Sequence, residues 1–88
     1  MADIDTTKFD KLTKAEKDEK TKYRGLKIKD DKDLTDLETM YVSKVKRIRE
    51  IIAGSNDKEN NQALLDKIER IQDKYAAVKH EQKLRKVV

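Results

Sequence analysis

The sequence predicts an all-α fold, an antiparallel two-helix hairpin of the coiled-coil type that follows a flexible or partly helical amino-terminal arm. Three observations support this prediction. The 88 residues include no proline, cysteine or tryptophan and only 2 glycines, which excludes a turn-rich β-sandwich and a disulfide or zinc-thiolate framework. Apolar residues recur at three- and four-residue steps in two segments, which is the period of an α-helix. Only a few residues around a glycine separate those segments.

The predicted arm, residues 1 to 32, forms the first domain. Its apolar residues are sparse, and residues 14 to 22 are almost wholly charged. Thr13 can cap a helix there, but only Ala15 can face a core, so such a helix is marginal on its own. Disorder, or order only on docking, is therefore weighed equally with a stable helix. Residues 26 to 29 alternate like a strand, but no second strand is available, so we expect an extended segment lying on a neighbour.

The first predicted helix covers residues 34 to 53. Asp33 or Thr35 can cap it, and Thr35 with Glu38 three residues later has the spacing of a capping box. Its apolar residues fall on one face of the helix. We expect Gly54 to end the helix in the left-handed conformation that glycine commonly supplies there.

The second predicted helix covers residues 57 to 85. Ser55 or Asn56 can cap it, and Glu59 follows Asn56 at the third position. From Leu64 to Val78 the apolar residues alternate between steps of four and three, which is a heptad seam. This helix is expected to be the longer of the two.

The short link forces the two helices to run antiparallel. Residues 33 to 88 therefore form the second domain, a helical hairpin. Its carboxyl-terminal residues extend past the first helix and run beside the end of the arm. There we expect Leu26 and Ile28 to pack against Val78 and Leu84.

Two facing helical stripes bury too little apolar surface to offset the conformational entropy of both helices. We therefore expect the hairpin to complete a helical bundle, either by forming a homo-oligomer or by docking onto a protein partner. The stripe expected to mediate this association consists of Leu34, Leu37, Tyr41, Val45, Ile48, Ile52, Leu64, Leu65, Ile68, Ile71, Tyr75 and Val78.

The alternative function is contact with a phosphate backbone. Two groups of basic residues support it. The basic cluster on the first helix, residues 44 to 49, can straddle phosphates. It can instead pair across the seam with acids such as Asp66, Glu69 and Asp73, and this second interpretation is favoured. The carboxyl-terminal group and the end of the arm make one end of the molecule locally basic. The candidate contacts are Lys27, Lys29, Lys44, Lys46, Arg47, Arg49, Lys79, Lys83, Arg85 and Lys86.

The sequence predicts no catalytic residue, no cofactor site and no metal site. His80 is the only histidine and the chain has no cysteine, so we expect His80 to be an exposed residue near a helix end. Asp30, Asp31, Asp33 and Asp36 resemble part of a calcium loop, but the glycine and the distal glutamate of that loop are missing. Helix capping explains these aspartates better.

The charge balance, with 22 basic and 18 acidic side chains and a net charge of +4, permits nucleic-acid binding without requiring it. No apolar run reaches the roughly 18 to 20 residues of a membrane span, and the start of the chain does not resemble a signal peptide. We therefore expect a soluble cytoplasmic protein with no membrane partner and no small-molecule substrate. The leading hypothesis is a non-enzymatic protein–protein interaction module that scaffolds or regulates a larger partner.

Overall fold

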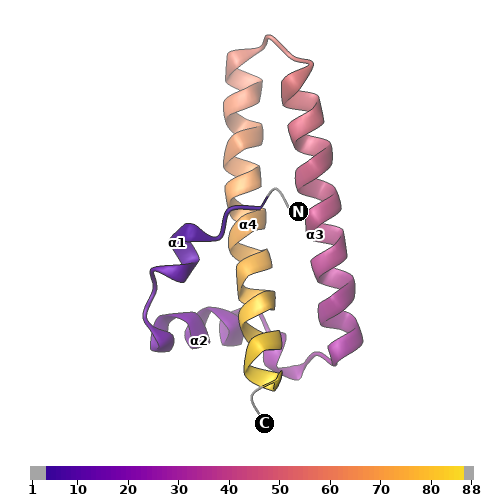
Figure 1. The fold of residues 1–88 in the computed structure, drawn as a ribbon. Helices are drawn as coiled ribbons and strands as arrows, with labels where there is room; N and C mark the ends of the chain where they lie inside the picture. Colours follow the sequence, from indigo (N-terminus) through magenta and orange to yellow (C-terminus); the bar gives the residue numbers. More distant parts are fainter. Residues whose placement is uncertain (1–3, 87–88) are drawn as a thin grey trace.

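The computed structural model describes residues 4 to 86, and within this range every regular element is helical. The order is α1 (Thr7–Asp10), α2 (Lys14–Tyr23), the 3-10 turn η1 (Leu26–Ile28), α3 (Asp31–Ala53) and α4 (Lys58–Lys86). The long helices α3 and α4 pack side by side and run in opposite directions, while α1 and α2 lie on the other side of α4 (Figure 1). The prediction of an all-helical fold is therefore confirmed.

Helix α3 begins three residues earlier than the sequence pattern predicts. Asp30 has an extended backbone, and its carboxylate accepts a 2.8 Å hydrogen bond from the backbone N–H of Asp33. The predicted caps Asp33 and Thr35 are wrong, because both residues already lie inside the helix. The Thr35 hydroxyl donates instead to the carbonyl of Asp31, one helical turn back. The apolar pattern could not reveal this start, because the first three residues of α3 are all polar.

The turn between α3 and α4 also differs from the prediction. Gly54 has a φ of −95°, so it is not left-handed, and its N–H donates to the carbonyls of Glu50 and Ile51. The α4 cap is Asp57, whose carboxylate accepts from the backbone N–H of Asn60 at 3.1 Å. The predicted caps Ser55 and Asn56 are therefore wrong. Asp57 takes this role because it lies three residues before the orphan N–H that it satisfies.

The described part of the arm, residues 4 to 32, packs against α4. Thr13 and Glu16 form a reciprocal capping box at the start of α2. Gly25, with φ of +70°, is the left-handed residue of the chain as described, and it turns the backbone from α2 into η1. The expected extended segment at residues 26 to 29 is wrong in its first three residues, because these form a 3-10 turn. Ile28 is 91% exposed, so its predicted packing is wrong too.

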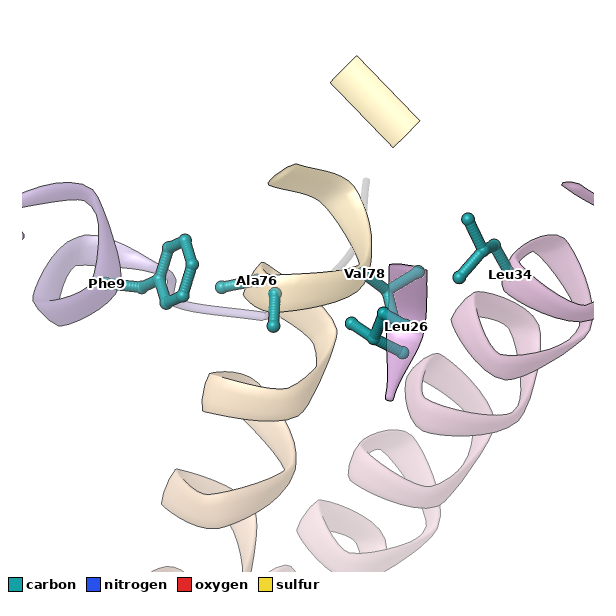
Figure 2. Packing of buried hydrophobic residues seen from close by; sticks show 6 residues of the cluster. Phe9, Leu26, Leu34, Ala76 and Val78 are labelled. Carbon is teal, nitrogen blue, oxygen red and sulfur yellow. The ribbon is translucent and has the colours of Figure 1, made fainter. Parts of the chain in front are cut away.

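Two apolar clusters form the core. The first joins the arm to both long helices and comprises Phe9, Leu26, Leu34, Ala76, Ala77 and Val78. Figure 2 shows Phe9 pointing at Ala76 from one side of α4, while Leu26 and Leu34 lie beside Val78 on the other. The second cluster, closer to the turn, comprises Val45, Ile48, Ile68 and Ile71. The predicted packing of Leu26 with Val78 is confirmed.

Candidate interaction surfaces

The predicted association stripe points mostly into the core of the chain itself. Of its members, Leu65 is the exception, with 45% of its surface exposed. Leu34, Val45, Ile48, Ile68, Ile71 and Val78 are buried, and Leu37, Tyr41, Ile52, Leu64 and Tyr75 are half-buried. Most of the apolar surface that the sequence assigns to a partner is thus in contact with other parts of this chain.

The basic cluster of α3 does not meet the acids expected to pair with it. Glu69 forms an ion pair with Lys8 of α1. Asp73 accepts from Arg24 at 2.7 Å and from Lys20 at 3.1 Å. These acids lie on the side of α4 that the arm covers, which the sequence pattern of the two long helices does not reveal. The favoured interpretation of cross-seam pairing is therefore wrong for Glu69 and Asp73.

The cations of this cluster lie on different sides of α3. Lys44, Lys46 and Arg47 are exposed and make no ion pair with any residue between 4 and 86. Arg49 lines a groove next to the arm together with Asp5. Its positive charge contributes to lowering the pKa of Asp5, where hydrogen bonds from Thr7 are the main cause.

At the other end of the molecule, Arg85 is used for internal contacts. Its guanidinium donates to Asp31 at 2.7 Å, to Glu81 at 2.9 Å and to the carbonyl of Lys29 at 2.6 Å. The bonds to the two carboxylates, with Asp31 the larger contribution, raise the pKa of Arg85 further. Arg85 thereby ties the last turn of α4 to the start of α3 and to the end of the arm.

Two more of the candidate phosphate contacts are paired with acids. Lys27 lies 2.7 Å from Glu81, and Lys79 lies 2.9 Å from Glu38. The bond to Glu38 raises the pKa of Lys79, and the same bond lowers the pKa of Glu38. The remaining cations of this end, Lys29, Lys83 and Lys86, make no ion pair within the described part of the chain.

Glu81 is a buried charged residue that sequence reasoning missed. Glu81 is 5% exposed, and its carboxylate forms an ion pair with Lys27 and accepts a hydrogen bond from Arg85. Burial acts to raise the pKa of Glu81, but these two partners outweigh it and the pKa is lowered. The sequence did carry a signal for the contact with Arg85, because side chains four residues apart are neighbours on a helix. The contact with Lys27 was not readable from local sequence.

His80 is not the exposed residue that the sequence predicts. Its side chain is 13% exposed, its Nε2 lies 2.9 Å from Oδ1 of Asp18, and its ring meets the ring of Phe9 edge to face at 5.9 Å. The hydrogen bond to His80 is the main cause of the lowered pKa of Asp18. His80 therefore fastens α1 and α2 onto α4. The prediction failed because it placed only the end of the arm beside this part of α4, and not Phe9 and Asp18.

A groove of about 890 Å³ lies between the arm and the amino-terminal half of α4. Phe9, Leu12, Leu65 and Ile68 supply its apolar lining. Charged residues of both signs surround this lining, namely Asp5, Lys8, Lys20, Arg24, Arg49, Asp66, Glu69, Arg70 and Asp73. Burial acts to raise the pKa of Asp73, but the bonds from Arg24 and Lys20 lower it overall.

Between residues 4 and 86 the structure contains no group of three or more His, Asp or Glu side chains placed to hold a metal ion. The aspartates at the start of α3 have structural partners within the chain, since Asp30 caps the helix and Asp31 accepts a hydrogen bond from Arg85. No helix in the described range is long and apolar enough to cross a membrane.

No protein-family model, curated protein or solved structure matches this chain. The surfaces described above are therefore the only basis for a proposed function.

Proposed function

We propose that this protein is a non-enzymatic helical module that binds another protein through the groove between its arm and α4. One observation supports this most directly. Leu65 is 45% exposed although it belongs to an otherwise inward-facing apolar stripe, and it lies in the lining of the groove. An apolar lining of this kind loses contact with water when a complementary apolar face docks.

The chemistry of the groove fits a protein segment better than a nucleic acid. Acids and bases both line the groove, with Asp5 and Asp66 among the acids and Arg49 and Arg70 among the bases. A phosphate backbone would be repelled by those acids, whereas an amphipathic helix with charges of both signs beside its apolar face can pair with both. In this proposal α3 and α4 form the antiparallel hairpin that scaffolds the groove, and the arm supplies its second wall.

Site-specific photo-crosslinking tests this proposal. A photoreactive amino acid placed at position 65 should capture a protein from the native host, whereas the same amino acid at Ile28 should not. Ile28 is the matched control, because it is also an exposed apolar residue but lies outside the groove. The captured protein, once purified, should bind Leu65→Asp at least roughly tenfold more weakly than wild type, and it should bind Ile28→Asp normally.

Two outcomes count against the groove. Equal capture from positions 65 and 28 would mean that contact is not selective. A partner that binds Leu65→Asp as tightly as wild type would mean that the groove is not the interface.

Nucleic-acid binding is the second candidate function. The observation in its favour is that Lys29, Lys83 and Lys86 lie at one end of the molecule and form no ion pair among residues 4 to 86, although the charge of Lys86 also acts on Glu38. If these cations contact phosphates, a gel shift should show affinity at low salt that falls steeply as salt rises. The triple change of all three lysines to glutamate should abolish the shift. Absence of binding at low salt would refute this candidate.

A further inference from the structure

The side of α3 away from the arm carries a second row of residues, which we call the outer stripe. It consists of Asp33, Asp36, Met40, Lys44, Arg47 and Ile51, each placed one position before a residue of α3 that belongs to the core or packs against it. Met40 is 39% exposed and Ile51 is 49% exposed. Exposed apolar side chains therefore occur at the middle of this stripe and near its end.

Helical geometry sets which side this stripe occupies. Arg49 follows the core residue Ile48 by one position and lines the groove on the arm side. One position corresponds to about 100° around a helix. Residues one position before the core row therefore lie on the opposite flank of α3, and the arm does not cover them.

Opposite charges stand at equal distances before and after Met40 on this flank. Lys44 follows Met40 by the same number of residues as Asp36 precedes it, and the same is true of Arg47 and Asp33. Asp33, Lys44 and Arg47 make no ion pair within residues 4 to 86. Asp36 has only an exposed contact with Lys32 at 3.7 Å. Acidic and basic halves of one stripe thus flank a partly exposed methionine at equal distances.

We infer that the outer stripe is the docking surface for a second copy of this chain, with the two α3 helices antiparallel and Met40 packed on its own counterpart. In this pairing Lys44 meets Asp36 of the partner copy, and Arg47 meets Asp33 of the partner copy. The two hairpins then complete a four-helix bundle.

The symmetry of the charges is what selects a second copy. A two-fold interface needs a surface that is complementary to itself, and a foreign partner imposes no such condition. A phosphate backbone lying along the stripe would meet Asp33 and Asp36 at one end. A parallel pairing of the two helices would set acids against acids and bases against bases. This surface is separate from the groove, so the inference does not depend on the proposed function.

Cysteine crosslinking of the full chain tests the two-fold axis, and the chain contains no native cysteine to interfere. On oxidation, Met40→Cys should form a disulfide-linked dimer, because the two positions face each other across the axis. Ile51→Cys is the matched control on the same stripe. Two copies of residue 51 would lie about 33 Å apart in the antiparallel pair, so this variant should remain uncrosslinked.

Charge reversal tests the pairing. The variants Lys44→Asp with Arg47→Asp, and Asp33→Lys with Asp36→Lys, should each dimerise roughly a hundredfold more weakly in sedimentation experiments. Mixing the two variants should restore a dimer, and combining all four changes in one chain should do so as well. The control is Lys46→Asp with Lys58→Asp. It changes the net charge by the same amount as Lys44→Asp with Arg47→Asp, but both positions lie off the outer stripe, so it should leave the dimer unchanged.

Restoration by the combined variant also separates loss of pairing from loss of folding. A monomeric wild-type chain at all concentrations, crosslinking through position 51, or failure of the mixed variants to pair would each overturn the inference. Leu65→Asp should remain dimeric, so failure of the groove proposal and failure of this one give different results.

Discussion

At the scale of single residues, the contacts that lock this molecule involve charged and aromatic side chains with no apolar periodicity. Glu81 is held by Lys27 and Arg85, and His80 is held by Asp18 and Phe9. Sequence reasoning missed Glu81 and expected His80 to be exposed. The reason is physical, because their partners in the arm are far away along the chain.

Glu81→Gln is expected to lower the free energy of unfolding by about 2 kcal/mol at pH 7, because it removes the ion pair with Lys27 and the charge on the acceptor of the hydrogen bond from Arg85. The lowered pKa of Glu81 means that its stabilising effect is present above the ordinary glutamate pKa of about 4.3 and is lost as pH falls below it. Urea unfolding should therefore show a smaller difference from wild type at pH 3. The exposed Glu19→Gln is the control, and an equal deficit at both pH values would contradict the assignment.

At the scale of elements, α4 is the helix on which the others pack. Its seam residues face α3, while Ala76 lies next to Phe9 of the arm. A small side chain at that position allows the arm to approach the helix closely. Charged pairs such as Arg24 with Asp73 then hold α2 against α4. Apolar periodicity revealed the seam but not the second buried face, since alanines add little to a hydrophobic pattern.

The two glycines should respond differently to substitution. Gly25→Ala is expected to cost about 1 kcal/mol, because Gly25 has a left-handed φ of +70° at the turn from α2 into η1. Gly54→Ala should be neutral or slightly stabilising, because φ is −95° and the nearest atoms to an added Cβ are 3.8 Å away. Thermal unfolding of both variants checks this. A larger loss of stability in Gly54→Ala than in Gly25→Ala would contradict this assignment of the left-handed backbone to Gly25.

At the scale of the whole molecule, the arm supplies part of the core that two helices lack. Phe9 and Leu26 are each 3% exposed and belong to the same cluster as Leu34 and Val78. This changes the argument for association. The inward-facing stripe is largely occupied within the chain, so the proposals for a protein partner and for a second copy concern other surfaces, the groove at Leu65 and the outer stripe at Met40.

The sequence by itself determined that this protein is helical and where its two long helices lie, because contacts between residues three and four apart leave a periodic record in the chain. Only the tertiary structure decided that the arm docks, that Arg85 and Lys27 act inside the molecule, and that Asp73 pairs with α2. These contacts join residues about fifty positions apart. The short link between the long helices did predict that Leu26 packs with Val78, but which charged side chains pair depends on how the arm is placed in space, and no local pattern encodes that placement.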